Sequence, residues 1–254
     1  MTTGTPITIR LTGGIAGHLL GMRALALAHA RFPGRPIVVY SEGANHIATL
    51  SPFVSKVITT APADGVTITI DASGDDLFAK AAIALRMPLF EFLAVRPVLQ
   101  MPEWAVADAD RILHELRVSR NASSSSFVGV CFASEDAETL TRFQPRILDA
   151  ISNALDAQAT SIAFNFLTTQ AQSHESLASL SALDSRIVPC ADLPIEVVAS
   201  LLTRCRYFVG GDNGIKQLAW ALDIPRTFFV KAPPPRLDIL RWMPDVHRML
   251  QFTP

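Results

Sequence analysis

The sequence predicts an α/β protein built from two Rossmann-like domains that face a cleft. Short apolar runs alternate with helical runs in both halves of the 254 residues, a pattern typical of parallel βαβ units. A low-complexity stretch, Asn121–Ser126, separates the two series, so we expect domains at 1–122 and 123–254. Ligands of such sheets bind beyond the carboxyl ends of the strands, and two facing sheets would enclose one deep cleft.

The first half opens with a β-branched run, Ile7–Leu11, which predicts a strand that ends in a glycine-containing loop. A helical run follows over His18–Phe32 and is closed by Pro33 and Gly34. The other elements expected in this half are strands at Pro36–Ser41, Lys56–Thr60 and Val66–Asp71 and helices at Gly43–Leu50 and Asp75–Arg86.

The second half repeats the alternation and ends in its most informative segment, Tyr207–Val230. That segment reads as a strand, a Gly-Gly-Asp-Asn-Gly turn, a helix, a proline and a second apolar strand. The elements expected before and after it are strands at Phe127–Phe132, Ser161–Leu167 and Ile187–Pro189 and helices at Glu138–Ala157, Glu175–Leu183, Leu193–Arg204 and Leu237–Met243 or beyond.

Charge and cysteine content limit the partners and the compartment. Lys and Arg number 22 against 23 Asp and Glu, which argues against a nucleic-acid partner. The cysteines Cys131, Cys190 and Cys205 are far apart and show no metal-ligand spacing, which favours buried free thiols in a reducing compartment. The first residues lack the apolar core of a signal peptide. We therefore expect a cytoplasmic protein, with the apolar region Pro88–Leu99 as a segment that could touch a membrane surface.

The turn Gly210–Gly214 can present backbone N–H groups at a helix N-terminus, where the helix dipole favours a phosphate or diphosphate. Arg142 and Lys216 could balance the charge of that ligand, and Ser134 follows another strand of the same half. In the alternative interpretation, the glycines only make the turn while Asp212 or Asn213 caps the helix.

A second glycine-containing loop joins the first strand to the first helix and carries Gly13, Gly14 and Gly17. Its G-G-x-x-G spacing differs from the dinucleotide fingerprint G-x-G-x-x-G, which disfavours an NAD site. His18 follows this loop, where a neutral imidazole would be a serviceable general base. The alternative is a capping or surface histidine without a chemical role.

The run Phe208–Pro225 resembles a motif of the ADP-heptose:lipopolysaccharide heptosyltransferase family, aliphatic-V-G-x-D-[ST]-G-x-x-H-L-A-A-A-L-x-x-P. Arg142-Phe143-Gln144-Pro145 is similar to the family's [KR]-x-W-P segment, and Gly17-His18-Leu19-Leu20 resembles a G-D-hydrophobic-L segment. His18 stands where that family has its proposed basic Asp, and Gln217 stands where it has His. The chain is also shorter than is usual in the family.

The resemblance implies a GT-B fold and an inverting, metal-independent glycosyltransferase of polysaccharide biosynthesis that uses no cofactor. Its donor would be a nucleotide-diphosphate sugar and its acceptor a glycan or lipid-linked hydroxyl, with His18 as the general base. The residues that would hold the donor are Ser134, Arg142, Gly211, Asp212, Asn213, Gly214, Lys216 and Gln217, and Gly13, Gly14 and Gly17 would lie on the acceptor side. Two other readings stay open: a sugar-nucleotide epimerase or hydrolase, and a non-catalytic module that binds a nucleotide or a partner.

Overall fold

The protein divides into two compact units, Met1–Gln100 and Met101–Pro254. The computed structural model describes residues 6–12, 14–41, 43, 45–60, 66–70, 82–83, 85–86, 88, 91–92, 95–119, 126–132, 137–155, 161–166, 180, 182–211, 213–230 and 246–251.

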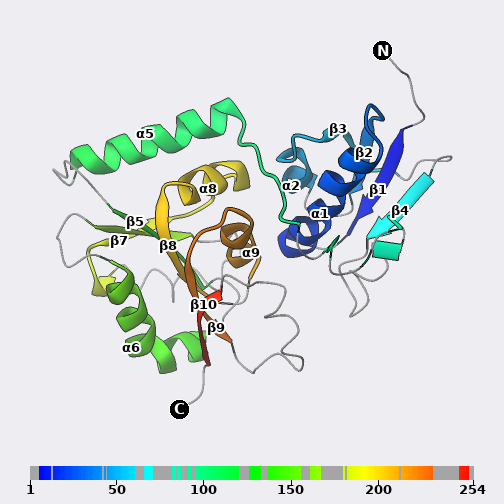
Figure 1. Ribbon diagram of the computed structural model, residues 1–254. Helices are drawn as coiled ribbons and strands as arrows, with labels where there is room; N and C mark the ends of the chain where they lie inside the picture. The colour runs from blue at the N-terminus through cyan, green and yellow to red at the C-terminus, as the bar shows by residue number, and fades with distance from the viewer. Residues whose placement is uncertain are drawn as a thin grey trace. The chain divides into compact units, whose positions relative to one another are not determined.

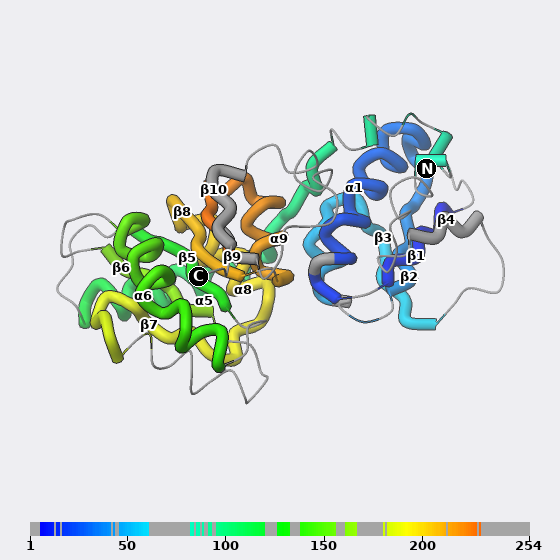
Figure 2. Tube along the Cα trace, turned by 90° about the horizontal axis from the view of Figure 1, so that it is seen from below, coloured from blue at the N-terminus to red at the C-terminus, as the bar shows by residue number. Residues whose placement is uncertain are grey.

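The first unit contains a four-stranded parallel sheet with the strand order β3-β2-β1-β4. Its elements are β1 (Ile7–Leu11), α1 (Ile15–Arg31), β2 (Ile37–Ser41), α2 (Asn45–Thr49), β3 (Val54–Ile58) and β4 (Val66–Ile70). Along β1, Ile7, Ile9 and Leu11 are buried at the two-residue period of a strand. Helices α1 and α2 pack on each other and on β2, and Figure 2 traces this part of the chain in blue and cyan.

The second unit contains a six-stranded parallel sheet with the order β10-β9-β8-β5-β6-β7. Its strands are β5 (Phe127–Cys131), β6 (Ile162–Phe166), β7 (Ile187–Cys190), β8 (Cys205–Gly210), β9 (Arg226–Val230) and β10 (Val246–Gln251). Its helices are α5 (Glu103–Ser119), α6 (Ala137–Ala154), α8 (Ile195–Leu202) and α9 (Gly214–Ala221). Every residue of β5 and of β6 is buried, as expected for strands in the middle of a parallel sheet.

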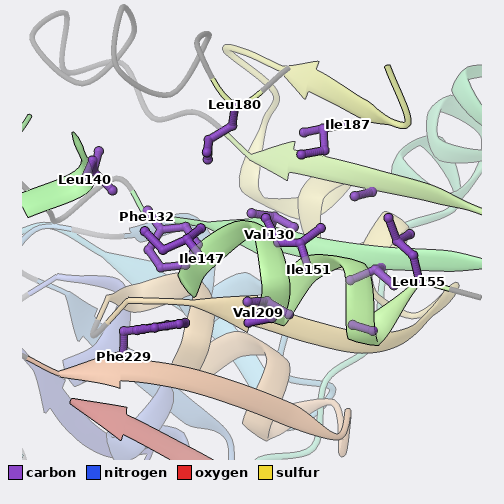
Figure 3. Packing of buried hydrophobic residues seen from close by; sticks show 14 of the residues in the cluster. Val130, Phe132, Leu140, Ile147, Ile151, Leu155, Leu180, Ile187, Val209 and Phe229 are labelled. Atoms are coloured by element: carbon purple, nitrogen blue, oxygen red, sulfur yellow. The ribbon is translucent and has the colours of Figure 1, made fainter. Parts of the chain in front are cut away.

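Helices cover both faces of this second sheet. Figure 1 shows α6 on one face and α8, with α5 laid along it, on the other. Ile147 and Ile151 of α6 and Leu155, the residue just after the helix, recur at four-residue spacing. They belong to one buried cluster with Val130 of β5 and Val209 of β8 (Figure 3). The alternation of strands and helices along the sequence therefore gives three layers, a sheet with helices on both faces.

The parallel α/β fold is confirmed, and most predicted elements are displaced by only a few residues. The unit boundary differs from the predicted one at 122/123, because α5 packs against α8 and so belongs to the second unit. Ala105, Ala109 and Leu113 are the buried residues of α5, a helix that was not predicted. Strand β10 was also not predicted.

Three predicted elements lie wholly or mostly outside the described residues: the helices at Asp75–Arg86, Glu175–Leu183 and Leu237–Met243.

Candidate functional site

The order of strands in the second unit reverses between β5 and β8. From β5 the chain moves outward through β6 to β7, then returns to place β8 on the other side of β5 and continues to β9 and β10. Ligands of open α/β sheets bind beyond the carboxyl ends of the strands at such a reversal. The ends of β5 and β8 are Cys131 and Gly210, which are register partners. This edge is therefore the candidate ligand site of the second unit.

The turn that leaves β8 is fastened to the end of β5 by two hydrogen bonds. The backbone N–H of Gly211 donates to the carbonyl of Cys131 over 2.9 Å. The side-chain Nδ2 of Asn213 donates to the same carbonyl over 3.0 Å. The Oδ1 of Asn213 accepts from the N–H of Lys216 over 3.0 Å and so caps α9. The capping interpretation is thus correct for Asn213.

Capping leaves several donors of α9 unused. The N–H groups of Asn213, Gly214 and Ile215 have no hydrogen-bond acceptor among the described residues. The first N–H groups of a helix lack intrahelical acceptors, and the helix dipole adds positive potential at the same end. These donors and the positive potential make the start of α9 suitable for an anion. Capping and anion binding are therefore compatible here.

Gly210 has a packing role. A Cβ at this position would collide with the Cys131 carbonyl oxygen and would lie 2.7 Å from Cζ of Phe208. Among the described glycines, a positive φ occurs at Gly34 and Gly43 and not in this turn. Glycine is needed at 210 because β5 and β8 approach closely, whereas no left-handed backbone requires it.

The two predicted cations of this half lie in different environments. Arg142 is exposed on α6, with its guanidinium carbon 5.4 Å from the centre of the Phe143 ring. Lys216 lies on α9 with only 4% of its surface exposed. Helix α6 follows β5 in the chain and α9 follows β8, so both residues belong to helices that start at the carboxyl edge of the sheet. Only Arg142 offers its side chain to solvent.

Gln217 is also buried, with 8% of its surface exposed. Its backbone N–H donates to the carbonyl of Asn213 over 3.4 Å. Its side-chain Oε1 is buried and accepts no hydrogen bond from the part of the chain that the structure describes.

His18 lies in the first turn of α1, which begins at Ile15 and not at His18 as predicted. Its side chain is completely buried. Nδ1 lies 3.1 Å from the carbonyl oxygen of Gly14, and Nε2 lies 2.6 Å from Oγ of Ser41 at the end of β2. Gly14 is the residue before the helix, and Gly17 is buried in its first turn. Ser41 was not among the predicted site residues.

Three predicted site residues, Gly13, Ser134 and Asp212, lie outside the described residues. In the described ranges, no three His, Cys, Asp or Glu side chains are grouped so that they could hold a metal ion. No helix in this part of the chain is both long enough and apolar enough to cross a bilayer.

The cysteines are free and buried, as predicted. Burial raises the pKa of the Cys190 thiol to about 12. Burial, and to a smaller extent the neighbouring Cys190, also raises the pKa of Cys205. Thiols held in the protonated form are poor nucleophiles and poor metal ligands.

No protein-family model matches the sequence, and a search of curated proteins returned no match. The search of solved structures did find similar folds. The glycosyl transferase family 9 structure from Veillonella parvula DSM 2008 has a TM-score of 0.63 and 12% sequence identity, over 98% of this chain and 86% of that chain. The chain has the fold of a glycosyltransferase.

Two structures from E. coli agree. ADP-heptose lps heptosyltransferase II has a TM-score of 0.61 at 12% identity, covering 97% of this chain and 89% of that one. Heptosyltransferase WaaC with ADP has a TM-score of 0.58 at 16% identity, covering 97% and 90%. The heptosyltransferase-like fold expected from the motif Phe208–Pro225 is therefore confirmed.

Proposed function

We propose that this glycosyltransferase-like chain is an inverting, metal-independent glycosyltransferase. It would move a sugar from a nucleotide-diphosphate donor to a hydroxyl of a glycan or lipid-linked acceptor. Structures of the same fold support the donor class, since they include WaaC with ADP-2-deoxy-2-fluoro heptose (TM-score 0.55) and the fucosyltransferase NodZ soaked with GDP-fucose (TM-score 0.51).

The observation that carries the proposal is the set of N–H groups of Asn213, Gly214 and Ile215, which have no acceptor among the described residues and lie where the strand order reverses. Fixed backbone donors at a helix N-terminus suit the oxygens of a diphosphate. They would also stabilise the charge that develops on the diphosphate as it leaves the sugar, and such stabilisation is usually the largest contribution to the rate.

The two cations of the second unit would contribute differently. Arg142 is exposed and can form charge-assisted, bidentate hydrogen bonds with phosphate. Lys216 is almost completely buried, so its charge would add to the positive potential at the start of α9 without forming the main direct contact. Ser134, Gly211, Asp212 and Gln217 remain proposed donor-side residues.

In the first unit, His18 would take the proton of the acceptor hydroxyl. The oxygen would attack the anomeric carbon from the face opposite the leaving group, and the bond between that carbon and the diphosphate oxygen would break. Proton removal by a positioned base contributes roughly 10²–10⁴-fold to a rate. Gly13, Gly14 and Gly17 would lie on this acceptor side.

Thermal stability in the presence of nucleotides tests the proposal. We expect ADP, GDP or UDP to raise the melting temperature of the chain, and the corresponding monophosphate to do so less, because the second phosphate binds the unused N–H groups. Inorganic phosphate controls for general anion binding. If no nucleotide stabilises the chain, the reading as a non-catalytic module that binds a partner is favoured.

Product analysis separates a transferase from an epimerase. A transferase releases nucleoside diphosphate from a nucleotide sugar, whereas an epimerase changes the sugar and keeps the glycosidic bond to the diphosphate. Conversion without release would contradict transferase activity.

A further inference from the structure

The hydrogen bonds of the His18 ring define which nitrogen carries a proton. A backbone carbonyl can only accept, so the contact of 3.1 Å between Nδ1 and the Gly14 oxygen requires a proton on Nδ1. In a neutral ring, Nε2 is then the basic nitrogen. It lies 2.6 Å from Oγ of Ser41, which therefore donates its hydroxyl proton to Nε2.

The Ser41 hydroxyl and His18 ring are buried together. His18 has no exposed surface and Ser41 has 2%. Ser41 is the last residue of β2 and pairs in register with Leu11, the last residue of β1. Ser41 therefore stands at the carboxyl edge of the sheet, where ligands of this fold class bind, and the ring stands behind it on α1.

We propose that Ser41 relays a proton to His18, an inference that rests on the proposed transferase function. The acceptor hydroxyl would hydrogen-bond to Oγ of Ser41, because Ser41 stands at the carboxyl edge of the sheet and the ring stands behind it. As the acceptor oxygen bonds to the anomeric carbon, its proton passes to Oγ while the proton of Ser41 passes to Nε2. The electron pair of the broken glycosidic bond leaves with the diphosphate, and His18 ends the step protonated on both nitrogens.

The relay differs from two other roles that the same geometry allows. If Ser41 only supports the ring, its hydroxyl has no part in proton transfer. If Ser41 is itself a nucleophile, the pair would resemble the serine and histidine of a covalent hydrolase, and Ser41 would form a bond to an electrophile. Neither of these roles predicts that two protons move in one step.

Nitrogen-15 NMR of the histidine rings tests the arrangement without any substrate. In the full chain above neutral pH, we expect His18 to carry its proton on Nδ1 and to leave Nε2 unprotonated. Ser41→Ala should change the shift of Nε2, whereas Ser51→Ala, a buried serine-to-alanine change elsewhere in the same unit, should not. A proton on Nε2 in the neutral ring would overturn the relay.

Turnover tests the transfer itself, with ADP-glucose, UDP-glucose and GDP-mannose as probe donors and water as acceptor. Ser41→Ala should lower nucleoside diphosphate release by about 10²-fold, in the range of proton-transfer catalysis, and leave nucleotide-induced stabilisation unchanged. Ser41→Thr, which keeps a hydroxyl, should restore part of the rate. The solvent deuterium isotope effect on the rate of nucleoside diphosphate release should indicate that two protons are transferred, both in the wild type and in Ser51→Ala.

The outcomes separate the two proposals. If His18→Gln abolishes release while Ser41→Ala leaves it unchanged, the relay is wrong and the transferase proposal stands. The relay would also be overturned if the solvent deuterium isotope effect indicated the transfer of a single proton, or if a fluorophosphonate labelled Ser41 covalently. If the wild type releases no diphosphate from any probe and no nucleotide stabilises it, the transferase proposal fails and the relay fails with it.

Discussion

The side chain of Asn213 donates to the carbonyl of Cys131 over 3.0 Å and thereby ties the start of α9 to the end of β5. The residues are 82 positions apart in the sequence. The same amide accepts from the N–H of Lys216, so one side chain both caps the helix and fixes it to the neighbouring strand. The geometry of the proposed phosphate site depends on this link.

Removing the link should destabilise the second unit. We expect Asn213→Ala to lower the free energy of unfolding by about 1–2 kcal/mol, since helix caps contribute in that range. Asn213→Ser keeps a capping oxygen and should lose less. Asn153→Ala, an exposed change near the end of α6, is the control and should stay within about 0.5 kcal/mol of wild type. Urea denaturation measures all three, and an unaffected Asn213→Ala would show that the cap carries no stability.

Gly210 and Gly14 should respond oppositely to alanine. Gly210→Ala forces a methyl group against the Cys131 carbonyl and the Phe208 ring and should cost about 2–3 kcal/mol, in the range of overpacked cores. A Cβ at Gly14 meets nothing within 4 Å, so Gly14→Ala should cost less than about 1 kcal/mol. Equal losses in thermal or urea denaturation would contradict the packing argument.

Arg142 and Arg146 offer a matched pair on α6. Both are exposed, and both place the guanidinium near the Phe143 ring, at 5.4 and 6.0 Å. Arg142→Ala should weaken binding of a nucleoside diphosphate about 10-fold or more, because a charge-assisted hydrogen bond contributes about 1.5–3 kcal/mol. Arg146→Ala should leave the affinity within about 2-fold, as expected for a charge that only adds to the general field. Titration calorimetry with ADP, GDP and UDP measures both, and equal losses would remove Arg142 from the site.

The buried thiols predict a loss of stability at alkaline pH. The pKa of Cys190 is about 9 in the unfolded chain and about 12 in the folded one. The free energy of unfolding therefore keeps its full value below pH 9 and declines as the pH rises toward 12, because only the unfolded thiol ionises in that range. Each such thiol should lower the free energy of unfolding by about 1.4 kcal/mol per pH unit in that window.

Cys190→Ala should make the free energy of unfolding decline less steeply with pH, because one of the buried thiols is gone. Urea denaturation between about pH 8 and about 10.5 measures this decline. The variant should also be less stable at neutral pH, because alanine leaves a space where the sulfur packed. The comparison therefore concerns the slope and not the absolute stability. Identical slopes in the variant and the wild type would contradict the raised pKa.

Local sequence signals predicted most helices and strands but could not predict which of them lie next to one another in the fold. The β-branched run Ile7–Leu11 and the turn after β8 are determined by residues adjacent in sequence. The hydrogen bond between His18 and Ser41 depends on the register of β1 with β2, which no short-range pattern reveals. The reversal between β5 and β8 depends likewise on strand order.

The sequence also did not reveal which polar and charged side chains would be buried. Arg142 and Lys216 both read as cations near a turn, yet packing of α9 against α8, β8 and β9 leaves Lys216 almost inaccessible. Helix α5 was missed because charged residues occupy much of it and only Ala105, Ala109 and Leu113 are buried. Three small or medium apolar residues at four-residue spacing are a weak helical signal.

The packing of α5 on α8 has a practical consequence for work with fragments. Every residue of Glu196–Leu202 is buried, and Asp110 of α5 forms an ion pair of 3.0 Å with Arg204 just beyond α8. A fragment cut at the low-complexity stretch Asn121–Ser126 would expose the apolar side of α8 to water and would favour aggregation. An expression fragment that begins at Met101 would keep that cover in place.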